Sequence, residues 1–305
     1  MPIKLVAPPH TPFTPQGELN LEVVELQAKY FFESGISGVF VCGSTGEGQS
    51  LSLKERMVLT ERWVEAARPK GLEVIVQVGS NCQPDAVRLA AHALETGANS
   101  IASLAPSYFK PATVDDLIEF FEPIAKAAQP LPFYFYDIPV LTGVTLSTVE
   151  FLERAHEKLP NLAGVKYTNE DLLQFQKCLQ VNEGHYEIWF GCDEALLDGY
   201  ILGAVAAIGS TYNFAAPLYL EMIDACDSGD IEKARQLQAK SVELIQLCQA
   251  YGFSAAAKVV MSVLGIDCGP SRSPLRNLST SQKNELIQQL TRLDVLAPCA
   301  SQINE

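Results

Sequence analysis

The chain has 305 residues, of which 48% are hydrophobic and 19% are charged, which is enough apolar material for one large buried core. The formal net charge is −14 and no run of Lys and Arg offsets it, so we expect the protein to bind neither nucleic acid nor anionic membranes. No stretch approaches the roughly 18 to 20 apolar residues of a membrane-spanning helix, and the first residues contain no apolar leader. We therefore expect a cytoplasmic protein.

Eight short apolar runs alternate along the chain with longer segments of helical period. Each run has the length of a strand buried on both faces, which is typical of a parallel sheet covered by helices. In chain order the predicted strands are Lys4–Pro8, Gly38–Cys42, Val74–Val78, Ile101–Ala105, Pro132–Tyr136, Leu162–Tyr167, Glu187–Phe190 and Ala206–Gly209. Eight βα units in series close naturally into a (β/α)8 barrel, the TIM barrel. A doubly wound open sheet is the alternative, and the even spacing favours closure.

The helical segments carry start and stop signals. Leu53–Ala67 is one such segment, because its apolar residues recur on one face and leave the charged residues to the other. Two polar residues, Asn20 and Ser52, are predicted N-caps. Helices are expected to end at Gly35, Gly97 and Gly203.

Strand signals stop after about residue 229. The remaining chain reads as three helices, Asp230–Ala250, Phe253–Leu264 and Ser279–Leu293, with Gly265–Ser273 as a loop. We expect residues 1–229 to form the barrel and residues 230–305 to form a helical extension packed on it. No linker is long or polar enough to mark an independent domain, so the two parts are expected to be one structural domain.

The cysteines and histidines favour neither a metal site nor a Ser-His-Asp enzyme. The cysteines form no C-x-x-C pair, which indicates free thiols, and the four histidines form no pattern with a nucleophile. We therefore expect no metal. The eight cysteines are Cys42, Cys82, Cys178, Cys192, Cys226, Cys248, Cys268 and Cys299.

Lys166 is the residue that fits a plain core least well. It lies inside the predicted strand Leu162–Tyr167, although lysine is almost never fully buried without a partner. Burial lowers the pKa of an amine, and a neutral amine is a nucleophile for a ketone, so Lys166 is a candidate Schiff-base residue. The alternative is a lysine that reaches from the strand end to solvent or to a carboxylate.

Tyr136 is a candidate proton-transfer group, because it ends a predicted strand and catalytic groups of barrels gather at the carboxyl ends of strands. Tyr134 faces the same side of that strand, so only its position at the end distinguishes Tyr136. The alternative is an aromatic packing residue with a hydrogen-bonded hydroxyl.

Three further strand ends carry groups suited to an oxygen-rich substrate. Gly43-Ser44-Thr45-Gly46-Glu47-Gly48 offers converging backbone N–H groups and two hydroxyls for a carboxylate or phosphate, or else forms only a tight βα connection. Asp193 and Glu194 are candidates for binding sugar hydroxyls or for helix capping by Asp193, and no histidine nearby suggests a metal. Ser210 and Thr211 are possible hydroxyl donors.

Three motifs together resemble the pyruvate-dependent class I aldolase family of N-acetylneuraminate lyase and dihydrodipicolinate synthase. They are Gly43-Ser44-Thr45-Gly46-Glu47, Tyr136-Asp137-Ile138-Pro139 and Gly164-Val165-Lys166-Tyr167-Thr168. The resemblance covers nearly the whole chain. Within the family it is strongest toward the sialic acid lyases, through the segments Leu141-Thr142-Gly143-Val144, Phe190-Gly191-Cys192-Asp193-Glu194 and Gly209-Ser210-Thr211-Tyr212-Asn213.

The resemblance implies reversible cleavage of N-acetylneuraminate into N-acetylmannosamine and pyruvate, without metal or organic cofactor. It implies that Lys166 forms the Schiff base, that Tyr136 takes the proton of the C4 hydroxyl, and that Ser44 and Thr45 hold the pyruvyl carboxylate, with both completing the proton relay. It also implies that the polyhydroxyl chain is bound by Thr168, Gly191, Asp193, Glu194 and Ser210.

Two further expectations concern assembly and selectivity. The resemblance implies a homotetramer in which Tyr108 contributes to the site of a neighbouring subunit. Leu141 matches a position where dihydrodipicolinate synthases carry an arginine that binds the carboxylate of the incoming aldehyde, which leucine cannot do. The alternative is that Leu141 only packs its loop.

Two other functions remain open on the sequence alone. One is another aldolase of the family, such as dihydrodipicolinate synthase or a 2-keto-3-deoxy sugar acid aldolase. The other is a barrel that binds sugar acids without turnover, which has no need of a buried amine such as Lys166.

Overall fold

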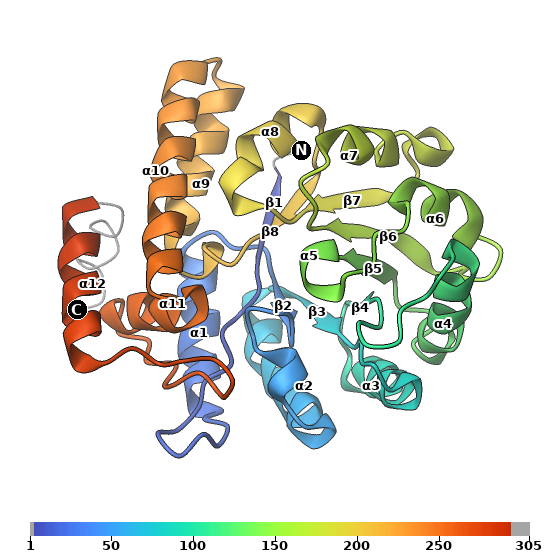
Figure 1. The fold of residues 1–305 in the computed structure, drawn as a ribbon, viewed down its shortest axis with the longest axis horizontal. Coiled ribbons are helices and arrows are strands. Elements are labelled where there is room, and N and C mark those ends of the chain that lie inside the picture. Colours follow the sequence, from blue (N-terminus) through green and yellow to red (C-terminus); the bar gives the residue numbers. More distant parts are fainter. Residues whose placement is uncertain (1–2, 294–305) are drawn as a thin grey trace.

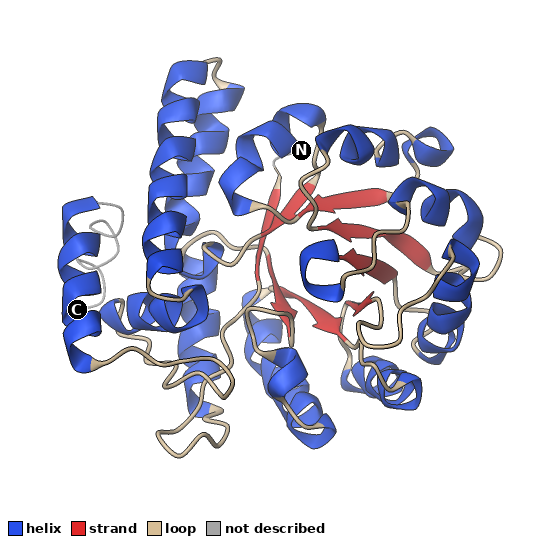
Figure 2. Ribbon diagram, in the orientation of Figure 1, coloured by secondary structure: helices blue, strands red, loops and turns tan. Residues whose placement is uncertain are grey.

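A computed structural model describes residues 3–293 of the chain, and within them eight parallel strands form a closed barrel inside a ring of helices (Figures 1 and 2). Neighbouring strands pair in chain order, and the first strand pairs with the last. The strands are β1 (Lys4–Ala7), β2 (Gly38–Val41), β3 (Glu73–Gln77), β4 (Ser100–Leu104), β5 (Phe133–Asp137), β6 (Leu162–Tyr167), β7 (Glu187–Phe190) and β8 (Ala206–Ile208). The predicted (β/α)8 barrel is confirmed, and each strand end lies within one residue of its predicted place.

Helices follow the strands and continue beyond the last one. The α-helices are α1 (Glu22–Glu33), α2 (Leu53–Ala67), α3 (Gln83–Thr96), α4 (Val114–Ala127), α5 (Pro139–Thr142), α6 (Thr148–Ala155), α7 (Leu172–Cys178), α8 (Leu196–Leu202), α9 (Tyr212–Asp227), α10 (Ile231–Ala250), α11 (Phe253–Val263) and α12 (Thr280–Leu293). Short 3-10 helices are η1 (Gly48–Ser50), η2 (Arg68–Lys70), η3 (Val181–Gly184) and η4 (Asp193–Ala195). None of these described helices is long and apolar enough to span a membrane.

The predicted helix starts have different outcomes. Ser52 caps α2, as expected, and the structure shows that Glu55 completes a full capping box. The prediction for Asn20 is wrong, because α1 begins after Leu21, whose side chain cannot cap, and the Asn20 N–H donates to the carbonyl of Pro12. The three predicted helix-ending glycines adopt positive φ angles just past α1, α3 and α8.

The barrel has two apolar layers, one inside the strands and one between the strands and the helices. Alternation along β6 shows the division, because Val165 and Tyr167 pack in the outer layer while Lys166 points into the interior. The interior layer contains Val6, Phe40, Ile75, Ala102, Leu104, Tyr134, Tyr136, Ile138, Trp189, Ala206 and Ile208. The lower interior is filled by Tyr134 stacked on Trp189 at 3.7 Å between ring centroids, with both side chains donating to Glu187.

The segment after β8 packs against the side of the barrel. Helices α9 and α10 form a long pair beside it, and α11 and α12 lie next to them (Figure 1). Helix α10 also contacts η4 and α8, the elements that follow β7. The last twelve residues of the predicted extension, 294–305, with Cys299, lie outside the described residues.

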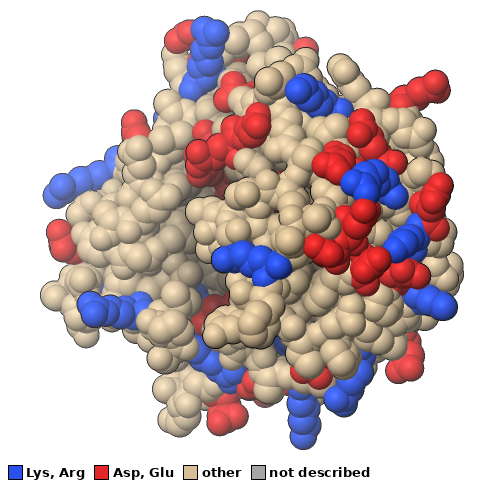
Figure 3. Space-filling model, turned by 45° about the vertical axis from the view of Figure 1, so that its right-hand side comes forward, with Lys and Arg blue, Asp and Glu red and all other residues tan. Residues whose placement is uncertain are grey.

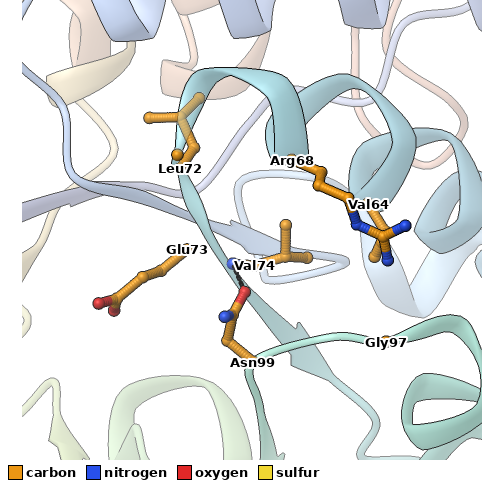
Figure 4. Close-up of a pocket in the computed structure, with 8 residues that line it drawn as sticks. Val64, Arg68, Leu72, Glu73, Val74, Gly97 and Asn99 are labelled. Atoms are coloured by element: carbon orange, nitrogen blue, oxygen red, sulfur yellow. Dashed lines mark hydrogen bonds between the residues drawn. The ribbon is translucent and has the colours of Figure 1, made fainter.

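A hollow of about 190 Å³ opens at the amino-terminal end of β3 (Figure 4). It is lined by Arg68, Glu73 and Asn99, and the Asn99 side chain accepts a hydrogen bond from the Val74 N–H. The hollow therefore lies at the amino-terminal end of the barrel. The candidate residues gather at the opposite end, where the strands have their carboxyl ends.

Candidate active site

Lys166 lies inside the barrel between two aromatic rings. Its Nζ is 4.0 Å from the ring centroid of Tyr136 and 4.1 Å from that of Phe40. The pairing of β5 with β6 sets Tyr136 directly beside Lys166, and β2 supplies Phe40 from across the barrel. The pairing therefore brings together two residues that the sequence singled out separately.

The electrostatics of this position favour a neutral amine. Lys166 is only 4% exposed, and burial lowers its pKa to about 7 against the opposing effects of Asp193 and Cys192. Ammonium on an aromatic face is attracted by the ring, but the rings cannot replace the lost hydration. A substantial share of Lys166 is therefore a free amine near neutral pH.

Tyr136 provides a phenol beside this amine. Its hydroxyl lies 3.4 Å from the Ser44 hydroxyl. Burial raises the pKa of Tyr136 to about 12, and the hydrogen bond with Ser44 and the nearby hydroxyl of Thr168 act in the opposite direction. Tyr134, which the alternation could not distinguish from Tyr136, bonds to Glu187 deeper in the barrel instead.

The loop after β2 brings Ser44 and Thr45 to the same end. The Thr45 hydroxyl lies 2.7 Å from that of Ser210, in the segment that follows β8. These hydroxyls, together with Tyr136, form a polar rim next to the amine, which can accept an anionic group of a substrate bound at Lys166.

Asp193 reaches the site from the segment after β7. One carboxylate oxygen, Oδ2, accepts from both the N–H and the hydroxyl of Thr211. The capping prediction for Asp193 is therefore wrong, since the carboxylate bonds to the chain after β8 instead of to its own helix. Burial raises the pKa of Asp193 to about 6, while the bonds from Thr211 act against it.

Two glycines let the polar groups approach the backbone closely. A Cβ on Gly209 would lie 2.1 Å from Asp193 Oδ1, and a Cβ on Gly191 would lie 2.1 Å from Thr168 Oγ1. Both positions therefore require glycine, and the side chains of Asp193 and Thr168 occupy the space that a larger residue would fill.

Three predicted residues lie at the periphery of this centre. Glu194 is exposed, Leu141 on α5 is 60% exposed, and Tyr108 is 78% exposed, with its ring edge against Phe109. Leu141 belongs to a short helix that follows β5 at the carboxyl end of the barrel.

The structure also adds residues that the sequence analysis left without a role. Lys258 forms a buried ion pair with Glu47, and Gln238 on α10 donates to the backbone carbonyl of Asp193. The signal for Lys258 was present, because it is a lysine inside the apolar segment Phe253–Leu264. No cluster of metal-ligating side chains occurs among residues 3–293.

Comparisons with known proteins agree with this geometry. A model of the dihydrodipicolinate synthetase family matches residues 1–293. The chain is 37% identical to N-acetylneuraminate lyase of Sus scrofa and 38% identical to that of Homo sapiens, each over 96% of this chain and 93% of the relative. A solved structure of Proteus mirabilis N-acetylneuraminate lyase is 38% identical, with a TM-score of 0.94 over 96% of this chain and 99% of that chain.

The buried position of Lys166 leads to a prediction about its chemical reactivity. Cyanate carbamylates only neutral amines, so the labelling of Lys166 should rise with pH and reach half its maximum near pH 7. Lys233 serves as the internal reference, because it is exposed and its ion pair with Glu221 raises its pKa. Peptide mass spectrometry after short exposures measures both. Labelling of the two lysines along the same pH curve would contradict the assigned environment.

Proposed function

Since the chain belongs to the dihydrodipicolinate synthetase family, we propose that it is a class I aldolase that cleaves N-acetylneuraminate reversibly to N-acetylmannosamine and pyruvate. The enzyme is a carbon–carbon lyase acting on small molecules. The observation that carries the proposal is the buried amine of Lys166 beside the phenol of Tyr136, at the carboxyl end of the barrel.

In the proposed mechanism, the neutral amine of Lys166 adds to the C2 keto carbon of the open-chain substrate. The resulting carbinolamine loses its hydroxyl as water after taking a proton from Tyr136, which leaves an iminium and a phenolate. The iminium nitrogen replaces an amine 4.0 Å from the ring centroid, so its positive charge stabilises the phenolate.

Cleavage then needs one proton to move and one bond to break. The Tyr136 phenolate accepts the proton of the C4 hydroxyl, the C3–C4 bond breaks, and its electron pair enters the iminium to give an enamine. The C4 carbon leaves as the aldehyde of N-acetylmannosamine. Tyr136 returns the proton to C3, and water then releases pyruvate and restores the amine of Lys166 and the phenol.

The remaining side chains would orient the two ends of the substrate. Ser44 and Thr45 would hold the carboxylate, because both hydroxyls lie at the rim. The Ser44 hydroxyl lies next to that of Tyr136, and the Thr45 hydroxyl lies next to that of Ser210. The hydroxyls of the sugar chain would be bound by Thr168, Gly191, Asp193, Glu194 and Ser210. The bonds from Thr211 to Oδ2 support the role of Asp193, since they hold its carboxylate in place at this end of the barrel.

We further propose that the protein is a cytoplasmic homotetramer. The exposed pair Tyr108 and Phe109 supports an assembly, because two large aromatic side chains are rarely left in water without a partner. In that assembly Tyr108 would enter the site of a neighbouring subunit. The acidic surface carries scattered basic side chains without a continuous basic patch on the face shown in Figure 3, which agrees with a small-molecule enzyme.

Reductive trapping tests the proposal directly. Borohydride added with pyruvate should inactivate the enzyme irreversibly and add the mass of the reduced pyruvate adduct to the peptide that contains Lys166. Borohydride alone and pyruvate alone are the controls. A label on another lysine, or none, would contradict the Schiff-base mechanism.

The Tyr136→Phe variant tests the proton transfer. Because a general acid–base group contributes roughly 10² to 10⁴-fold, turnover of N-acetylneuraminate should fall within that range, while pyruvate is still trapped at Lys166, at a lower rate, because water can supply the proton for iminium formation. Tyr134→Phe is the matched control, since the Tyr134 hydroxyl bonds to Glu187 away from the site. A loss of turnover below about threefold in Tyr136→Phe would show that another group carries the proton.

The Leu141→Arg variant tests substrate selectivity. A charge-assisted hydrogen bond is worth roughly 1.5 to 3 kcal/mol, so the ratio of aspartate semialdehyde condensation to sialic acid cleavage should rise by about ten- to a hundredfold. Val140→Arg, at the exposed neighbouring position, controls for added charge alone. If wild-type protein already prefers aspartate semialdehyde, the lyase assignment is wrong, and an unchanged ratio in Leu141→Arg would exclude this residue as the selector.

A further inference from the structure

A second buried lysine lies outside the proposed catalytic chemistry. Lys258, on α11, places its Nζ 2.7 Å from Oε1 of Glu47, and the two side chains are only 3% and 1% exposed. Glu47 belongs to the loop after β2 that carries Ser44 and Thr45. The pair therefore joins the helical segment beyond the barrel to the loop at the rim of the site.

The ammonium of Lys258 holds more than one part of this rim. It donates to the carbonyls of Thr11 and Pro270 at 3.0 and 2.9 Å, and lies 4.6 Å from the ring centroid of Phe13. The hydroxyl of Thr11 in turn donates to the carbonyl of Gly46 at 2.5 Å. Lys258 thus touches the loop through the Glu47 side chain and, by way of Thr11, through the backbone at Gly46.

Glu47 stabilises the loop through its backbone and through its side chain. Its backbone is left-handed, with φ of 55°, and its N–H donates to the carbonyl of Ser44. The Arg272 N–H donates to Oε2 of Glu47, and the Arg272 guanidinium binds Glu55 at the start of α2. Both carboxylate oxygens of Glu47 are therefore engaged by residues of the segment that follows α10.

Other ionisable groups around the pair do not replace either partner. Burial, followed by the charge of Lys258, holds the pKa of His10 at about 3, so this imidazole is neutral in the working range of pH. Burial raises the pKa of Cys268 to about 12, so this thiol is neutral as well. Lys258 is the cation in direct contact with the buried carboxylate of Glu47, while the guanidinium of Arg272 also acts on Glu47 but is itself paired with Glu55.

We propose that the Lys258–Glu47 pair is a positioning device that holds the hydroxyls of Ser44 and Thr45 in place for the carboxylate of the keto acid. This inference rests on the proposed function, because it assumes that these hydroxyls bind that carboxylate. A buried ion pair adds little net stability compared with apolar residues, but removing one partner leaves an uncompensated charge. Here that charge would be a carboxylate within the loop that receives the substrate's own carboxylate.

The electrostatic asymmetry makes the two single variants differ. Lys258→Met removes the positive partner, so the loop loses its anchor and the charge balance beside the substrate's carboxylate becomes less favourable to an anion. Glu47→Gln also loses the anchor but removes the negative partner, so the charge balance becomes more favourable to an anion. A residue with only a general role in folding would not produce this order.

The experiment measures borohydride trapping at Lys166 as a function of carbonyl concentration. For pyruvate, the half-saturating concentration should rise roughly ten- to a hundredfold in Lys258→Met, the range expected for a misplaced binding group, and less in Glu47→Gln. For hydroxyacetone, which has no carboxylate, it should stay within about twofold of wild type in both variants. Lys233→Met, which removes an exposed lysine from an ion pair with Glu221, is the matched control.

The trapping experiment distinguishes failure of this inference from failure of the proposed function. Three outcomes would overturn this inference but leave the proposed function standing. They are unchanged trapping of pyruvate in Lys258→Met, an equal or larger effect in Glu47→Gln than in Lys258→Met, and an equal loss with hydroxyacetone. Failure of wild type to trap pyruvate would overturn the proposed function and this inference with it. If Lys258→Met does not fold, the Glu47→Gln variant tests the proposal. Its half-saturating concentration should rise for pyruvate but not for hydroxyacetone. The absence of such a selective rise would contradict the proposal.

Discussion

The removal of one amine from water is the interaction on which the rest of the site depends. Lys166 is held between the rings of Phe40 and Tyr136 because β6 turns alternate residues into the barrel, and this interior offers no full replacement for hydration. An exposed lysine would remain an ammonium and could not attack a ketone. The phenol of Tyr136, the hydroxyls of Ser44 and Thr45 and the carboxylate of Asp193 all gain their proposed roles from this one neutral nitrogen.

The polar groups around that nitrogen are held by bonds that come from outside the barrel. Gln238 binds the backbone of Asp193, and Lys258 binds Glu47, so two helices beyond β8 reach two different loops of the rim. Loops that carry binding groups need such support, because a small displacement of a binding group weakens its contact steeply. The helical segment after the barrel is thereby part of the architecture of the site.

Much of this could be predicted from the sequence because it depends on local patterns. Strand lengths, the capping box at Ser52 and the anomaly of Lys166 are properties of short segments. The start of α1 could not be predicted in this way, since the Asn20 N–H pairs with the carbonyl of Pro12 in the preceding loop and the helix begins only after Leu21. The link from Lys258 to Glu47 joins residues far apart in the chain, so its partner became evident only from the fold, although a lysine in an apolar helix was already a visible signal.

The stacked rings of Tyr134 and Trp189, bonded to Glu187, have a consequence for the sequence of events in turnover. They fill the barrel below the amine, so a ligand would reach Lys166 from the carboxyl end of the barrel. In the proposed reaction, a substrate joined to Lys166 through its keto carbon would keep that end innermost and its sugar chain toward the carboxyl end. The sugar fragment would then leave before the three-carbon fragment, and the three-carbon product would be the one that competes with incoming substrate for the free amine.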